Sequence, residues 1–153
     1  VVALLFTMFL LLFRSLLISV IALFPNLISI GFVLGFMGWF NIPLDLMTIT
    51  IAAISMGIAV DNTIHYIYRF KIEINIDNDY SKAMTRTHKS IGFAMYYTSA
   101  TIIVGFSILI LSNFIPSIYF GLLTSMAMLI ALFSSLVLLP QILILLKPFN
   151  INR

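Results

Sequence analysis

The sequence contains no cysteine and very few charged residues. Without cysteine, the chain cannot form disulfide bonds, thiolate metal sites or a cysteine nucleophile. No stretch has the spacing of a nucleotide-binding loop, a zinc site or an activated nucleophile. The net charge of +3 is also too small to indicate a nucleic-acid-binding surface. We therefore expect no cofactor, no metal ion, no nucleic-acid partner and no catalytic residues, and we do not expect an enzyme.

Apolar residues dominate what remains. Hydrophobic residues make up 62% of the 153 residues and charged residues 8%, and the mean hydropathy is +1.18. A soluble domain is about half apolar and about a quarter charged, and a soluble fold of this size could not bury so much apolar surface. The sequence therefore predicts an all-α membrane protein with one transmembrane domain over residues 1–153. The chain opens at Val1 inside an apolar run without signal-peptide features, so we expect a fragment of a longer chain.

Five apolar stretches are predicted to be transmembrane helices. They are residues 1–13, 16–40, 44–68, 91–112 and 118–146. The first would rise only about 20 Å as a helix, less than the roughly 30 Å hydrocarbon core, so we expect it to be the end of a truncated span. Residues 69–90 form the polar region between the spans. In this region, Asp79 is a suitable N-cap for a short helix over residues 80–90.

The short helix is predicted to have one basic face, because Lys82, Arg86 and Lys89 follow helical spacing. We expect this face to lie along the membrane surface against anionic lipid headgroups. All eight basic residues fall on one side of the five spans: Arg14, Arg69, Lys71, Lys82, Arg86, Lys89, Lys147 and Arg153. Under the positive-inside rule that side is cytoplasmic, which predicts a multi-pass protein of the cell (inner) membrane with a cytoplasmic C-terminus.

Asp61 is an ionisable residue inside an apolar segment, and such a residue is a functional-site hypothesis by default because it is costly there. It lies about 25 Å along the third span from Leu44 and about 12 Å from Arg69, in the inner half of the hydrocarbon. No Lys or Arg occurs in any span, so burial favours the protonated acid. Gly57 lies one turn away, and we expect Gly57, with Gly105 on the fourth span, to allow close helix packing at the site. The alternative is a protonated acid that only hydrogen-bonds a neighbouring helix.

Four side chains are candidate partners of Asp61: Asn62, His65, Thr98 and Thr101. His65 lies one turn nearer the predicted cytoplasmic side, where it could pass protons to Asp61 or simply pack at the interface. Asn62 could equally join two helices by a hydrogen bond. Thr98 and Thr101 share one face of the fourth span, but both could instead bond back to carbonyl groups of their own helix.

Residues 57–65 resemble the G-x-x-x-D signature of the fourth helix in the resistance-nodulation-division (RND) superfamily, with Gly57 and Asp61 at the fixed positions. The resemblance is closest to the MmpL, hydrophobe-exporter and Patched- or Dispatched-like branches, which include a five-helix unit like the sterol-sensing domain. Further segments that look like this family are residues 13–26, 41–45, 105–116, 120–124 and 138–140.

The resemblance implies that the chain supplies helices two to six of one six-helix half, and the C-terminal half is the better match. It implies proton-driven export of a hydrophobic or lipid substrate, with Asp61 in the proton relay. The expected partners are membrane lipids, the missing N-terminal half and extracytoplasmic domains of the same protein, and a homo-oligomer or accessory proteins. Two departures leave Asp61 without a second acid. Many relatives have an acid or Tyr at the position of Asn62, and many have an acid near Ser134 or Ser135.

Three functions are consistent with five such helices. The leading one is the membrane part of a proton-coupled transporter that exports lipids or other hydrophobic compounds. The second is a non-transporting module that senses sterols or lipids, and the third is an RND-type accessory of protein secretion. Asp61 favours transport, because sensing does not need a buried acid.

Overall fold

The computed structural model describes residues 2–43 and 45–149, which are almost entirely helical and include no strand. The α-helices are α1 (Val2–Phe13), α2 (Leu16–Trp39), α3 (Leu46–Asp77), α4 (Tyr80–Thr87), α5 (Phe93–Ser107), α6 (Ile115–Phe133) and α7 (Leu139–Leu146). Two π-helical segments, η1 (His88–Gly92) and η3 (Ser134–Leu138), join α4 to α5 and α6 to α7. A 3₁₀ turn, η2 (Ile108–Leu111), ends α5.

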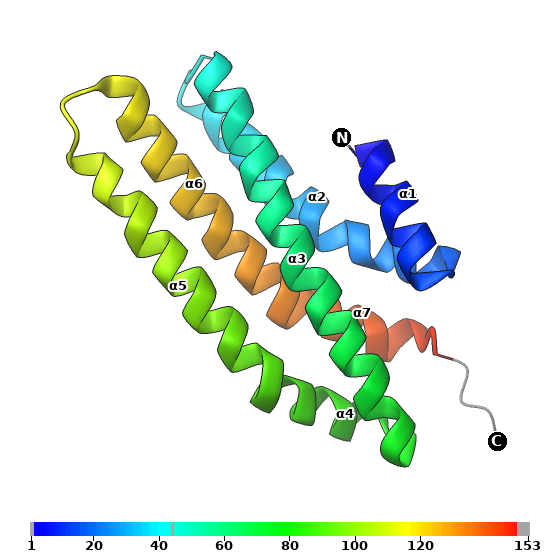
Figure 1. Cartoon of the computed structure of the whole chain (residues 1–153). Coiled ribbons are helices and arrows are strands. Elements are labelled where there is room, and N and C mark those ends of the chain that lie inside the picture. Colours follow the sequence, from blue (N-terminus) through cyan, green and yellow to red (C-terminus); the bar gives the residue numbers. More distant parts are fainter. Residues whose placement is uncertain (1, 44, 150–153) are drawn as a thin grey trace.

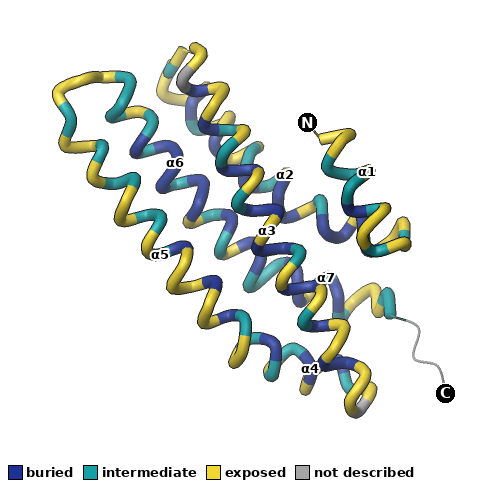
Figure 2. The backbone as a smooth tube through the Cα atoms, viewed as in Figure 1, coloured by how far each residue is buried: buried dark blue, intermediate teal, exposed yellow. Residues whose placement is uncertain are grey.

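Helices α2, α3, α5 and α6 form the body of a bundle, and α1 packs against α2 (Figure 1). Helix α6 lies in the middle and contacts α2, α3 and α5. Buried residues follow α6 and the inner faces of α2 and α3, whereas most of α5 is exposed (Figure 2). Helix α5 therefore lies at the edge of the bundle, where it packs against α6.

Within the described ranges, three helical segments are long and apolar enough to cross a membrane: Leu16–Trp39, Tyr80–Leu111 and Ile115–Leu146. The apolar helix Val2–Phe13 is shorter. Helix α3 has 32 residues, so it extends for about 48 Å, more than the roughly 30 Å of hydrocarbon in a bilayer. The prediction of an all-α membrane protein is confirmed.

Basic residues gather at one end of the bundle. The α2–α3 and η2–α6 connections lie at the upper left of Figure 1, and the α1–α2 turn, the α3–α4 turn and the end of α7 lie at the lower right. The described basic residues are in or near the second group: Arg14, Arg69, Lys71, Lys82, Arg86, Lys89 and Lys147. Arg153 lies outside the described residues.

Helix α3 continues to Asp77, more than two turns beyond residue 68, where the third span is predicted to end. Arg69 and Glu73 are charged but stand at i and i+4, where their side chains pair and favour the helix. The helix ends at Asn78, which adopts a left-handed conformation with φ of 55° and donates its N–H to Ile74 O. A left-handed residue at this position is a common helix stop, and Asn tolerates it well.

Asp79 caps the helix that follows, as predicted. Its carboxylate accepts hydrogen bonds from the backbone N–H groups of Ser81 (3.0 Å) and Lys82 (3.2 Å). The Lys82 bond contributes most to holding the pKa of the Asp79 carboxyl below its usual value, and burial opposes it. Because the folded-state pKa is lowered, the cap stabilises α4 at pH values above the ordinary aspartate pKa, and this stabilisation is lost as the pH falls through the lowered value.

Glu73 is a buried acid, with only 4% of the residue exposed. Glu73 Oε1 lies 2.7 Å from Arg69 Nη2, and Glu73 Oε2 lies 2.7 Å from Arg86 Nε. Arg86 Nη2 also donates to the backbone oxygen of Glu73 at 2.9 Å. Arg86 therefore points at α3 instead of completing the predicted basic face, and it fastens α4 to α3. The exposed basic residues of that face are Lys82 and Lys89.

Helices α2 and α3 are joined by a buried polar contact. Asn26 Nδ2 donates to Ala22 O at 2.8 Å and lies 3.4 Å from Thr63 Oγ1. This contact follows Pro25, which lies inside α2, and α2 is bent in Figure 1. A proline inside a helix removes one backbone N–H, and a bend there is the usual consequence.

Gly121 allows a close contact between two helices. A Cβ atom there would lie 2.5 Å from Phe106 O and 2.9 Å from Leu109 Cβ, so α6 and the α5–η2 helix meet at a residue without a side chain. At Gly105 the same atom would meet nothing within 4 Å.

Gly121→Ala should therefore destabilise the protein by about 1–3 kcal/mol, because the new methyl group clashes with backbone that cannot move alone. The matched control is Gly105→Ala, which should leave stability unchanged or slightly raised. Thermal unfolding of the purified full-length protein in detergent measures both. Equal effects of the two substitutions would contradict this packing.

Glu73→Gln should destabilise the protein by about 3 kcal/mol, because it leaves two arginine side chains without their buried counter-charge. Lys82→Gln is the control, since it removes an exposed 3.5 Å pair with Asp79 and should cost about 1 kcal/mol or less. Denaturant unfolding of the full-length protein gives both values, and a loss for Glu73→Gln no larger than the control would rule out the clamp.

Candidate functional site

Asp61 and His65 lie side by side on the exposed face of α3. His65 Nε2 is 3.3 Å from Asp61 Oδ1, and the two side chains are 60% and 69% exposed, respectively. Residues 57, 61 and 65 are one helical turn apart and share this face, whereas Thr63 and Tyr66 point inward and are fully buried. The acid is therefore on the surface of this bundle and not in its core, and its nearest ionisable neighbour is His65.

A groove of about 370 Å³ runs beside Asp61 between α3 and α5. Its lining residues are Gly57, Ile58, Asp61, Asn62, Thr98, Ser99 and Ile102. The structure thus brings Asp61, Asn62 and Thr98 to one opening. Thr101 and Gly105 do not line this groove.

The two threonines bond to their own helix, which is the alternative left open by the sequence. Thr98 Oγ1 lies 2.8 Å from Ala94 O and 3.1 Å from Met95 O, and Thr101 Oγ1 donates to Tyr97 O at 2.9 Å. Each hydroxyl group has a single hydrogen, so both retain only the capacity to accept a further bond. Thr98 is therefore positioned to accept a hydrogen bond near the groove and not to donate one.

The glycines of the site face open space. A Cβ atom at Gly57 or at Gly105 would meet nothing within 4 Å. Neither residue is needed for packing between the helices described here, so the expected packing role finds no partner helix in this part of the chain. What Gly57 does provide is room beside Asp61, because it lines the groove.

Ser99 is a site residue that the sequence reasoning missed. It lines the groove, it is 1% exposed, and its hydroxyl group has no hydrogen-bond partner among the described residues. Residues 95, 98, 99 and 102 follow the spacing of one helix face, and this spacing could have placed Ser99 next to Thr98. The buried ion pair between Glu73 and Arg86, which is outside the groove, was also not predicted. The two residues are 13 positions apart on different helices, and no local pattern links them.

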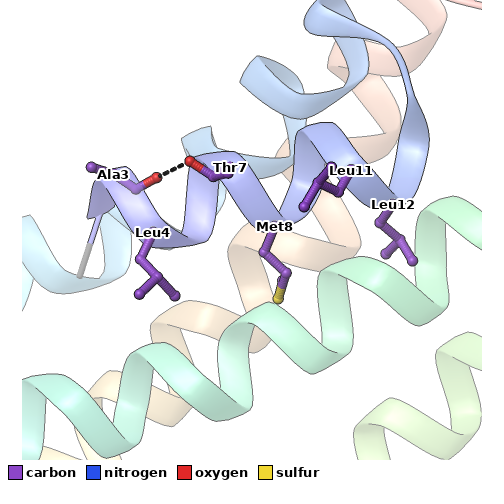
Figure 3. A pocket seen from close by; sticks show the side chains of 6 residues that line it. All are labelled: Ala3, Leu4, Thr7, Met8, Leu11 and Leu12. Atoms are coloured by element: carbon purple, nitrogen blue, oxygen red, sulfur yellow. Dashed lines mark hydrogen bonds between the residues drawn. The ribbon is translucent and has the colours of Figure 1, made fainter.

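A larger hollow, of about 700 Å³, lies along α1, away from these polar residues. It is lined by Ala3, Leu4, Thr7, Met8, Leu11 and Leu12 (Figure 3). Thr7 donates its hydroxyl hydrogen to Ala3 O at 2.9 Å, so its polar atom is already engaged. This groove can contact hydrocarbon but has no group that could exchange a proton.

The chemistry available at the α3 groove is proton exchange. A carboxyl group and an imidazole 3.3 Å apart can share one proton, and the open space beside Gly57 gives water or another helix access to them. In the described part of the chain, no group of three His, Cys, Asp or Glu side chains could hold a metal ion.

Comparison with known proteins places the chain in a family. The sequence matches the MMPL family over residues 1–152. A relative from Methanocaldococcus jannaschii, described only as a membrane protein, is 35% identical over 100 residues, which are 65% of this chain and 26% of the relative. The matched segment thus spans a small part of that relative's length, and no solved structure matches the chain. Because the family match extends over nearly the whole sequence, this chain belongs to the MMPL family.

Proposed function

We propose that the chain is the membrane part of an RND-type transporter that exports lipids or other hydrophobic compounds and is driven by the proton motive force. The observation that carries this proposal is the Asp61–His65 pair beside a groove on a membrane-protein helix. Membership of the MMPL family supports a transporter.

Asp61 is the proton-relay residue in this proposal, and His65 is its exchange partner. An ionisable residue at membrane depth is costly and usually faces a bundle interior or a water-filled cavity. Here the pair faces outward from the bundle, with more than half of each side chain exposed. We infer that another part of the same protein, the second six-helix half, covers this face and completes the relay.

The surface chemistry, and not the relay, supports the proposed substrate class. The groove along α1 presents mainly hydrocarbon, which suits a hydrophobic or amphiphilic molecule and offers nothing to a polar one (Figure 3). The clustering of the basic residues at one end of the bundle supports a cytoplasmic C-terminus in the cell membrane.

The proposal is tested by Asp61→Asn in the full-length protein. Asn keeps the size of the side chain but cannot take up and release a proton. We expect export of a fluorescent hydrophobic compound, driven by an imposed pH gradient in proteoliposomes, to fall to the level of protein-free vesicles.

The matched control is Asp79→Asn, which makes the same change at an exposed N-cap where Asn serves as well as Asp, so export should persist. Gradient-dependent export by Asp61→Asn would refute the relay. Absence of export by the unchanged protein, with any hydrophobic compound tried, would count against the transporter itself.

A further inference from the structure

His88 makes contacts between helices that take no part in the relay pair. Its Nε2 lies 2.9 Å from Leu136 O, and its Nδ1 lies 3.1 Å from Tyr66 Oη and 3.0 Å from Met84 O. In the tautomer that carries its hydrogen on Nε2, His88 donates to Leu136 O. The residue four positions after Leu136 is Pro140, which has no backbone N–H to offer that carbonyl group.

The two segments joined by this bond are both π-helical. His88 begins η1, and Leu136 lies in the middle of η3. Single π-helical turns inside α-helices are rare and occur frequently at functional sites. The groove beside Asp61 is lined from α3 and α5 alone, so the proposed relay gives neither π-helical segment a function.

A second cavity lies where these segments meet. It has a volume of about 380 Å³ and is lined by His88, Lys89, Gly92, Phe93, Tyr96 and Leu136. This volume is within the range of small-molecule sites, about 300–1,000 Å³. The His88 ring nitrogens are engaged with the protein, so the cavity presents mainly aromatic and hydrocarbon surface. Phe93 and Tyr96 are 61% and 54% exposed, which leaves this surface accessible from outside the bundle.

Lys89 supplies the charge at this cavity. It is exposed and forms no ion pair with a described acid, whereas Lys82 pairs with Asp79 and Arg86 pairs with Glu73. Lys89 is also the last basic residue before the apolar helix that continues to Leu111. A lysine at the junction of a charged segment and a membrane-crossing helix lies at the depth of lipid headgroups.

We propose that this cavity binds an anionic phospholipid, with one hydrocarbon chain against Phe93, Tyr96 and Leu136 and the phosphate group against Lys89. The apolar walls require a hydrocarbon chain, and the unpaired ammonium group selects a headgroup with net negative charge. The lipid contacts both π-helical segments and so bridges the same two helices that His88 joins. This site depends on the chain being in a membrane and not on its transporting anything.

The experiment uses the full-length protein in two preparations of phosphatidylcholine nanodiscs. Each preparation contains the same small fraction of one photoactivatable lipid. The lipid is phosphatidylglycerol or phosphatidylcholine, each with a diazirine on one acyl chain close to the glycerol group. Mass spectrometry after illumination locates the labelled residues. We expect phosphatidylglycerol to label residues 88–96 and 134–138 about five-fold more than phosphatidylcholine does, which is the effect of one basic side chain near an anionic headgroup.

Two lysine variants separate a defined site from general attraction at the membrane surface. Lys89→Gln should lower phosphatidylglycerol labelling to the phosphatidylcholine level, and Lys82→Gln, the same change at an exposed lysine outside the cavity, should not. Gly92→Leu fills the cavity, since a Cβ there already touches His88 and Leu136 at 3.7 Å, and it should remove labelling by both lipids.

Thermal unfolding checks that Gly92→Leu is folded, and if it is not, Lys89→Gln still decides the matter because its side chain is exposed. Equal labelling by the two lipids would overturn the proposal. So would equal losses in the two lysine variants, or labelling spread evenly along α5. None of these results depends on export, so failure of this site and failure of the transporter assignment can be told apart.

Discussion

A polar group in hydrocarbon must find its partner inside the protein, and this constraint explains most of the arrangement seen here. Thr98 and Thr101 bond to carbonyl groups one turn back, Asn26 reaches both its own helix and α3, and Glu73 is held by two arginines. The case of Pro140 is the most indirect. The proline has no backbone N–H to offer the carbonyl group of Leu136. The imidazole of His88, 48 residues earlier in the chain, lies within hydrogen-bonding distance of that carbonyl group instead.

Asp61 and His65 differ from these groups, because they pair with each other on an exposed face of α3. Their exposure is not a consequence of poor packing, since Thr63 and Tyr66 on the opposite side of the same helix are fully buried. Helix α3 thus has one tightly packed face and one exposed face, and the exposed face carries an acid. In the proposed transporter, the second half of the protein covers that exposed face.

The sequence predicted the parts of the fold that depend on local chemistry. The apolar stretches gave α1 and α2 within about one residue, and Asp79 gave the start of α4, because hydropathy and capping act over a few positions. The end of α3 was missed because Arg69, Glu73 and Arg86 pair with one another, so a charged stretch read as a loop is helical and partly buried. At the site, spacing placed Asp61, His65 and Gly57 on one face. It could not show that α5 leaves a groove there or that His65, and not Thr98, is the nearest partner, since both depend on how two helices lie in space.

The two faces of α3 also differ in how they are held. On its inner face, Thr63 meets Asn26 of α2, Tyr66 meets His88, and Glu73 fastens α4. On its outer face the groove separates it from α5, a helix that is exposed over most of its length and packs mainly against α6. In the proposed relay, a change of charge at Asp61 acts on the outer side of α3, next to the groove. The inner contacts hold the helix in place, and the open groove leaves room for neighbouring segments to respond.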